Sequence, residues 1–589
     1  MDPHIAALAA AHGIETEYED VWGRKHIASE ATVQAILRAL AAAEQGIRKV
    51  DEPTAISGPE RVHSVEGRMA GLAISLYGLR SRRNWGCGDF TDLQNLTTEF
   101  ARAGAHFIAL NPLHAIANRQ PYNISPYLPL CALYRNYLYL DVERVGAGVK
   151  LNMGGETLRE IEALRGSGFV EYERVAELKL RVLRGLFADF LGGGGSIEFQ
   201  RFVDDEGTAL LRFATFQALY DEMHRRDPKV WVWADWPEEY RDPTSPEVQR
   251  FEHDHADQVR FYQWVQWQVD RQLAEAQEHA LTEGLRIGLY HDLALATDRC
   301  GCDLWAFREF YVPGCRVGSP PDEFSPKGQD WAFPPPNREA HRASGYELFA
   351  QLIRKNARYG GALRIDHVMR FFRLYWIPDG MDATEGAYVR DYPEDLLRVL
   401  ARESAGEDTR AKFVVIGEDL GTVTEEVRKA LGSSGVLSYR LLWFERNADG
   451  TFRRPDEYPQ QAAVSSSTHD LATLSGFFSA RDITARRDAG LIDDAVAQQQ
   501  YDSREHEKKM LAEALERAGF ADDPLGFLLS TPCALAVVNQ EDLTGELDQQ
   551  NLPASTWQHP NWRRKMRVAV EELGGIAGEF QRLVKRSGR

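Results

Sequence analysis

Two short apolar runs flank a helical segment in residues 71–110, which read GLAISLYGLRSRRNWGCGDFTDLQNLTTEFARAGAHFIAL. The runs Gly71–Tyr77 and Ala105–Leu110 have the length and composition of buried strands. Between them, Leu96 and Phe100 are spaced so as to share one face of a predicted helix. A strand, a helix and a second strand in this order form a β-α-β unit, in which the two strands run parallel.

Similar apolar runs recur along the rest of the chain. They bring the number of predicted strands to eight, and the further ones are Arg286–His291, Ala362–Asp366, Phe413–Gly417, Val436–Trp443, Ala462–Ser466 and Cys533–Val538. Eight strands separated by helical segments predict an α/β fold, the (β/α)8 TIM barrel, in preference to an open doubly wound sheet. No G-x-G-x-x-G motif follows the first strand, so the sequence does not indicate a dinucleotide-binding fold.

The barrel is expected to carry large helical and loop insertions and to follow a small N-terminal helical region. Residues 1–48 show helical spacing, and residues 49–70 are polar and contain prolines, which predicts a helical region followed by a linker. The catalytic barrel would then cover residues 71–589, with a helical insertion at about 145–280. Residues 311–337 are rich in proline and glycine, so we expect a long active-site loop without regular structure.

Composition narrows the possible functions. The 589 residues are 43% hydrophobic and 27% charged, as in soluble globular proteins, and a formal net charge of -19 opposes binding to nucleic acids or anionic membranes. No run of about 18 apolar residues occurs, so no membrane-spanning helix is predicted. The six cysteines form no C-x-x-C pair and no basic segment precedes the first apolar residues, so we expect reduced thiols, no signal peptide and a cytoplasmic location.

Acidic residues stand at or just after the ends of several predicted strands. Asp292 follows the third strand, Asp366 ends the fourth, Glu418 follows the fifth, and Asp470 comes soon after the seventh. Because functional residues of TIM barrels lie at the C-terminal ends of the strands, these carboxylates are expected to converge on one rim. A single carboxylate there could equally cap a helix, but several on one rim with no nucleotide-binding loop indicate glycosidic bond chemistry.

Retaining glycosidic chemistry needs one ionised carboxylate as nucleophile and one protonated carboxyl as acid. Arg364 and Asp366 share a face of their strand, and the guanidinium should keep Asp366 ionised, which makes it the candidate nucleophile. Glu418 follows the apolar run FVVIG, where burial should raise its pKa, so it is the candidate acid/base. Asp470, beside His469, is expected to hold sugar hydroxyls and stabilise an oxocarbenium-like transition state.

At these residues the sequence resembles the amylomaltases, the 4-α-glucanotransferases of glycoside hydrolase family 77 in the α-amylase superfamily. The resemblance extends from about Gly71 to Asn561. It rests on the combination of NWGCGDF (84–90), SPY (125–127), VGSPPDEFSPKGQDW (317–331), ALRIDHVMRFFRLYWIP (362–378), GEDLG (417–421) and STHD (467–470). The resemblance implies transfer of α-1,4-glucan segments between maltodextrins, with Asp366 as nucleophile, Glu418 as acid/base and Asp470 as transition-state stabiliser.

The resemblance also implies which residues hold the sugar and what else the protein binds. Sugar contacts are implied for Tyr122, Tyr127, Asp292, Trp331, Arg364, His469 and Asn551. The expected partners are maltooligosaccharide donors and acceptors, glucose included, with no nucleic acid and no membrane, in a monomer or homodimer. No cofactor and no metal site is implied.

The chain departs from the family's usual pattern at two places. The family usually has glycine where Ala332 and Ala554 stand, and threonine where Ser555 stands. Both departures lie near implied sugar contacts, Trp331 and Asn551. We therefore expect this chain to differ from other members of the family in how it binds the acceptor sugar.

Two other functions compete with this interpretation. An α-amylase-type hydrolase would use the same three carboxylates but transfer the glucan to water. A glucan-binding protein without catalytic activity would bind the sugar chain and leave it intact. Ser465–Ser467, near His469 and Asp470, would suit a serine hydrolase, but the chain has no G-x-S-x-G motif. We therefore expect a 4-α-glucanotransferase.

Overall fold

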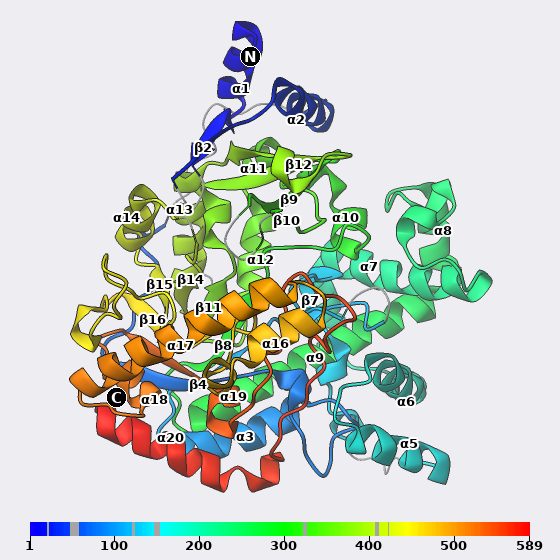
Figure 1. The fold of residues 1–589 in the computed structure, drawn as a ribbon. Coiled ribbons are helices and arrows are strands. Elements are labelled where there is room, and N and C mark those ends of the chain that lie inside the picture. The colour runs from blue at the N-terminus through cyan, green and yellow to red at the C-terminus, as the bar shows by residue number, and fades with distance from the viewer. Residues whose placement is uncertain are drawn as a thin grey trace.

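The computed structural model describes residues 1–19, 23–47, 58–119, 124–146, 153–321, 325, 327–406, 412–421 and 423–589. Its centre is a closed barrel of parallel strands (Figure 1). In chain order the barrel strands are β4 (Met69–Ile74), β5 (Phe107–Leu110), β8 (Gly288–Leu293), β11 (Ala362–Ile365), β14 (Val414–Gly417), β15 (Leu437–Leu441), β16 (Ala462–Ser465) and β17 (Leu535–Asn539). The last strand pairs with the first, which closes the sheet, so the (β/α)8 prediction is confirmed.

The barrel strands are buried on both faces, which explains why their sequences are almost continuously apolar. Side chains fill the interior, and the rings of Phe107 and Tyr290 lie 5.7 Å apart there. Gly71 in β4 makes room for them, because a Cβ at this position would lie 2.3 Å from the Phe107 ring. The barrel is therefore a packed core whose functional surface is at its rim.

Helices cover the outside of the barrel (Figure 1). They include α3 (Phe90–Arg102), α9 (Ala256–Thr282), α12 (Glu347–Ala357), α13 (Pro393–Ala405), α14 (Glu425–Ser433), α17 (Asp494–Arg517), α18 (Pro524–Ser530) and α20 (Gly574–Ser587). Helix α3 begins with a capping box, in which the Asp89 side chain accepts hydrogen bonds from the backbone amides of Thr91 and Asp92. Its buried face includes Leu93, Leu96 and Phe100.

Between β5 and β8 the chain makes a large helical insertion. It contains α5 (Gly155–Gly166), α6 (Tyr172–Gly192), α7 (Ile197–Arg226), α8 (Pro246–Asp254) and α9. In Figure 1 helices α5, α6 and α8 lie to the right, away from the C-terminal helix α20. Aromatic side chains hold the insertion together, with the rings of Phe187 and Trp264 5.4 Å apart.

The proline-rich segment 311–337 contains regular structure, so the prediction of an irregular loop is wrong. Strands β9 (Cys315–Ser319) and β10 (Gln329–Asp330) pair antiparallel within it. They belong to a five-stranded sheet whose order is β1, β13, β12, β9, β10. The prolines of the segment flank β9 and leave its backbone amides free to pair, which is why their number did not prevent a strand.

The N-terminal region contains strands as well as the predicted helices. Helices α1 (Pro3–Ala11) and α2 (Glu30–Ala43) accompany β1 (Ile14–Glu15), β2 (Glu17–Glu19) and β3 (Lys25–Ile27). Strand β1 pairs with β13 (Ala387–Arg390), which in turn pairs with β12 (Arg373–Pro378). Strand β1 thus joins the N-terminal region to the five-stranded sheet, at the top of Figure 1, while β2 and β3 pair with each other.

The predicted linker, residues 49–70, lies partly outside the described residues, since residues 48–57 are not described. Its last two residues belong to the barrel, because β4 begins at Met69. Within the described ranges, no helix is both long and apolar enough to cross a membrane.

Candidate active site

The predicted carboxylates come together at one end of the barrel. Asp292 is the second-to-last residue of β8, and Asp366 and Glu418 directly follow β11 and β14. Strands β11 and β14 are neighbours in register, so Ile365 stands opposite Gly417 and places Asp366 and Glu418 side by side. Asp470 reaches the same rim on the segment that follows β16. Tyr122, which was predicted to contact the sugar, lies outside the described residues.

A buried arginine links the two carboxylates of β8 and β11. Arg364 donates to both oxygens of Asp292 over 2.8 Å and, through its other terminal nitrogen, to Oδ1 of Asp366 over 3.0 Å. The Tyr127 hydroxyl donates to Oδ2 of Asp292 over 2.6 Å. Burial raises the pKa of Asp292, with Arg364 acting in the opposite direction. The side chain of Asp366 remains 23% exposed, so a substrate can reach it.

Glu418 is held by backbone amides. Its Oε2 accepts a hydrogen bond from the amide of His367 over 2.9 Å, and its Oε1 accepts one from the amide of Leu420 over 2.8 Å. Burial raises the pKa of Glu418 to about 7, and the nearby charge of Asp366 acts in the same direction. At neutral pH Glu418 can therefore both hold and release a proton.

The backbone conformation of His367 directs the amide N–H of this residue at Glu418. Its backbone is left-handed, with φ 48°, which a residue other than glycine adopts only at a cost of roughly 1–2 kcal/mol. Its ring lies edge-on to Trp331 with centroids 5.2 Å apart, and burial lowers its pKa to about 4. His367 is therefore neutral at pH 7, and the strained turn serves to orient its N–H group.

Asp470 has a different set of partners. Its Oδ1 accepts a hydrogen bond from the Asn551 side-chain amide over 2.7 Å, and its Oδ2 lies 3.4 Å from Nε2 of His469. Burial by itself would raise the pKa of Asp470, but His469 and Asn551 outweigh it, and the pKa is lowered. Asp470 is therefore ionised at neutral pH.

Aromatic rings form one wall of the site. Tyr127 stacks on His469 with centroids 4.2 Å apart, and Trp562 lies 5.3 Å from Tyr127 and 5.1 Å from His469. Such a wall suits the apolar C–H faces of a pyranose ring, and the neighbouring carboxylates suit its hydroxyls. Trp562 was not predicted, because its distance along the chain from the other residues of the wall hides the contact.

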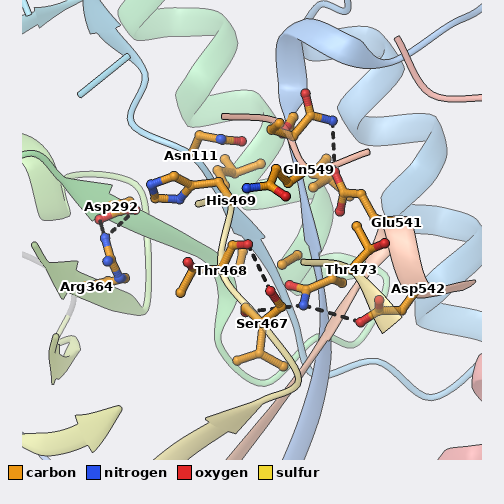
Figure 2. A pocket seen from close by; sticks show the side chains of 18 of the residues that line it. Asn111, Asp292, Arg364, Ser467, Thr468, His469, Thr473, Glu541, Asp542 and Gln549 are labelled. Carbon is orange, nitrogen blue, oxygen red and sulfur yellow. Dashed lines mark hydrogen bonds and ion pairs between the residues drawn. The ribbon is translucent and has the colours of Figure 1, made fainter. Parts of the chain in front are cut away.

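A cavity of about 100 Å³ opens beside these residues (Figure 2). Arg364 and Asp292 lie on one side of it, Glu541 and Asp542 on the other, and His469 between them. Several of the polar residues that line it were not predicted from the sequence, namely Asn111, Tyr439, Thr473, Asn539, Glu541, Asp542, Gln549 and Gln550. Glu541 and Asp542 follow β17 as Asp366 follows β11, so the strand-end rule could have found them.

No group of three or more histidine, cysteine or acidic side chains suited to a metal ion occurs in the part of the chain that the structure describes. The three carboxylates predicted to carry the chemistry, Asp366, Glu418 and Asp470, all lie on this rim. An accessible carboxylate beside an arginine, a carboxyl with a pKa near neutrality and an ionised carboxylate on one barrel rim define the class of enzymes that cleave and form glycosidic bonds.

Comparisons with known proteins identify the member of this class. The family described as 4-alpha-glucanotransferase matches residues 74–570. The 4-alpha-glucanotransferases of Haemophilus influenzae and Mycobacterium bovis are 33% and 36% identical, each across 84% of this chain and across 75% and 71% of their own lengths. The chain therefore belongs to the 4-α-glucanotransferases of glycoside hydrolase family 77, the amylomaltases. The predicted transferase function is confirmed, and a hydrolase is not favoured.

Solved structures agree with this assignment. The crystal structure of amylomaltase from Corynebacterium glutamicum superposes with a TM-score of 0.81 at 25% identity, over 98% of this chain and 99% of that one. The amylomaltase of Streptococcus agalactiae, solved in complex with acarbose, has a TM-score of 0.71 at 18% identity, over 89% of this chain, and shares the fold.

The two departures from the family's pattern occupy strained positions. Ala332 and Ala554 have φ values of 61° and 62°, in the left-handed region that glycine adopts without steric cost. Ala332 follows Trp331, on the Glu418 side of the site, and Ala554 lies three residues beyond Asn551, on the Asp470 side. The backbone thus keeps, with alanine, a conformation suited to the glycine found elsewhere in the family.

Proposed function

We propose that this protein exchanges α-1,4-glucan segments between maltooligosaccharides by double displacement at Asp366 and Glu418. The observation that carries the proposal is the pairing of two neighbouring carboxyl groups in opposite settings. Asp366 is partly exposed and bound by Arg364 over 3.0 Å, whereas burial raises the pKa of Glu418 to about 7. One group is suited to attack and the other to donate a proton.

In the first half of the reaction Asp366 attacks the anomeric carbon of the donor glucan. A bond forms between its carboxylate oxygen and this carbon, while the bond to the leaving 4-oxygen breaks and Glu418 gives that oxygen its proton. The product is a β-linked glucosyl-enzyme. Arg364 stays bound to Asp292 throughout, which keeps the guanidinium and therefore Asp366 in place.

In the second half Glu418 is a carboxylate and acts as base. It takes the proton of the 4-hydroxyl of an acceptor, whose oxygen attacks the anomeric carbon and releases Asp366. The two inversions restore the α configuration. The sugar acceptor replaces water, and we assign to Trp331, at the end of β10, the task of covering the intermediate and excluding water.

Asp470 acts in the transition state. We infer that it binds ring hydroxyls of the reacting glucose more strongly once the ring flattens towards the oxocarbenium form. His469 and Asn551 keep it charged, and Tyr127, Asp292 and His469 complete the binding of the reacting sugar. Tyr122 remains a predicted contact without a described position.

Incubation of the purified protein with maltotriose tests this proposal. Chromatography over time is expected to show glucose together with a ladder of longer maltodextrins, because each transfer shortens one chain and lengthens another. Glucose and maltose alone would overturn the proposal in favour of hydrolysis. Absence of any product from maltotriose and from maltoheptaose would leave glucan binding as the function.

The location and assembly of the protein remain predictions. All six cysteines are free thiols, which supports the cytoplasmic location that we propose. The predicted state is a monomer or homodimer, and size-exclusion chromatography with light scattering would decide between them.

A further inference from the structure

A second cavity, of about 460 Å³, shares no lining residue with the cavity at the active site, and none of the three carboxylates lines it. Its walls come from the segment after β4, the end of α5 and the segment before α20. We call it the basic pocket, because five of its lining residues are cationic and two are acidic. They are Arg80, Arg82, Arg165, Lys565 and Arg567, with Glu162 and Glu572. This excess of positive charge in the pocket contrasts with the chain as a whole, whose formal net charge is -19.

Two of the cations are neutralised locally and three are not. Arg82 pairs with Glu572 over 3.1 Å, and Arg567 pairs with Glu546 over 3.1 Å. Arg165 donates instead to the backbone carbonyls of Asn84 and Arg83, over 3.0 and 3.2 Å. Carbonyl oxygens satisfy hydrogen bonds without cancelling the charge of the guanidinium.

Lys565 is the most informative of the unpaired cations. It is only 5% exposed, and its ammonium group donates to the Leu164 carbonyl over 2.8 Å without a carboxylate partner among the described residues. Burial lowers the pKa of Lys565 to about 8, and the charge of Arg80 contributes to this decrease. A buried ammonium without a counter-ion is costly, and an anion in the pocket would remove that cost.

Arg80 supplies the third unpaired charge. Its side chain lines the pocket and is partly exposed, and its guanidinium forms no hydrogen bond or ion pair with any residue that the structure describes. A guanidinium is planar and has donors arranged to bind two oxygens of one phosphate group. An anion in the pocket could therefore contact three cationic groups, which are the unpaired guanidinium of Arg80, the guanidinium of Arg165 and the ammonium of Lys565.

We propose that the basic pocket binds a phosphate monoester the size of a hexose phosphate. The three unpaired cations would bind the phosphate group. The remaining lining is suited to hydroxyl groups, because the carboxylate of Glu162 is exposed there and can accept hydrogen bonds. The volume of about 460 Å³ leaves room for a sugar ring beside the phosphate.

Isothermal titration calorimetry on the full-length protein at low ionic strength tests the proposal with glucose 6-phosphate, inorganic phosphate and glucose. We expect saturable binding of glucose 6-phosphate, weaker binding of inorganic phosphate, and an Arg80→Gln variant whose affinity for both is lower by about tenfold. Arg165→Gln should have a similar effect. Both side chains are partly exposed and leave no carboxylate unpaired, so the variants should fold, which their melting temperatures verify.

Two controls separate this pocket from other sites. Arg102→Gln removes a guanidinium that pairs with Glu99 on the surface of α3 and should leave every affinity unchanged. Glucose, which has the ring without the phosphate, should give the same heats in wild type and in Arg80→Gln. Failure of the wild type to bind either phosphate, or equal affinities in wild type, Arg80→Gln and Arg165→Gln, would overturn the proposal. Equal affinities for inorganic phosphate and glucose 6-phosphate would overturn its sugar component.

Discussion

Glu418 and Asp470 stand on the same barrel rim, but their surroundings differ in the kind of group that binds them. Glu418 receives hydrogen bonds from the backbone amides of His367 and Leu420, and burial raises its pKa to about 7. Asp470 receives the side-chain amide of Asn551 and lies beside His469, and its pKa is lowered although burial acts in the opposite direction.

The difference shows that burial alone does not set the protonation of a carboxyl group. At Glu418 the two backbone amides lower the pKa less than burial and the charge of Asp366 raise it, whereas at Asp470 the charge of His469 and the hydrogen bond from Asn551 outweigh burial. Two carboxyl groups on one rim can therefore be acid and anion at the same pH. Asp366 lies next to Glu418, and its negative charge adds to the rise in the Glu418 pKa.

The largest expected effect comes from Asp366→Asn. An amide does not form the glucosyl-enzyme, so kcat/KM for maltotriose should fall by about 10⁴-fold or more. Removing the neighbouring charge should also lower the pKa of Glu418, which a titration of Glu418 followed by NMR would detect. Activity close to wild type in this variant would reject the nucleophile assignment.

Glu418→Gln should lower the rate by about 10²- to 10⁴-fold, because the leaving oxygen then departs without a proton. A donor with a good leaving group, such as an α-maltosyl fluoride, needs no such proton. With that donor the first half of the reaction should recover, and burst kinetics would measure the recovery. An equal loss with maltotriose and with the fluoride would contradict the role of Glu418 as acid.

The pH dependence should differ between the two sides of the site. Glu418 must be protonated for the first half, and its pKa is raised to about 7, so kcat/KM should fall above pH 7, by about 100-fold at pH 9. The pKa of Asp470 is lowered, so this group stays ionised over the same range and adds no alkaline limb. A profile between pH 5 and 9 measures this. Constant kcat/KM up to pH 9 would refute the raised pKa.

Asn551→Ala tests the Asp470 side of the comparison. The variant loses a 2.7 Å hydrogen bond to a carboxylate, and we expect kcat to fall by about tenfold because Asp470 is held less firmly against the transition state. The alkaline limb of the pH profile belongs to Glu418 and should not move. A shifted limb with an unchanged kcat would mean that Asn551 acts on the other side of the site.

The smallest effects should come from relieving backbone strain on each side. Ala332→Gly and Ala554→Gly remove a Cβ at φ values of 61° and 62° and should each raise the free energy of unfolding by up to about 1 kcal/mol. Ala512→Gly, at an exposed position within α17, should instead lower it by about 1 kcal/mol. Urea denaturation measures all three. A loss of stability in both site variants would show that the strain is compensated elsewhere.

The sequence predicted the barrel and the positions of its carboxylates because both depend on local pattern. Apolar runs mark strands that are buried on both faces, and the residue after such a run lies on the rim. Contacts between distant segments left no such pattern. The Trp562 ring contacts the Tyr127 ring, and β1 pairs with β13, across sequence separations that no periodicity reveals.

Local signals also failed where two of them competed. The proline content of residues 311–337 concealed β9, whose five residues contain no proline. The sequence carries no local signal for the basic pocket, because only the fold brings Lys565 and its cationic neighbours around one cavity. The opposite settings of Glu418 and Asp470 likewise depend on His367 and Asn551, whose orientation only the folded chain defines.

Closure of the barrel between β4 and β17 has a consequence for biosynthesis. Met69 in β4 pairs with Leu535 in β17, and Ile14 in β1 pairs with Val389 in β13. Neither sheet can therefore be completed during synthesis before these later strands have been made. At 5–20 residues per second a ribosome needs on the order of half a minute to a minute and a half to pass from β4 to β17. During this interval one apolar edge of β4 is unpaired and can pair with strands of other nascent chains. The demand for chaperones should therefore be greatest before β17 emerges.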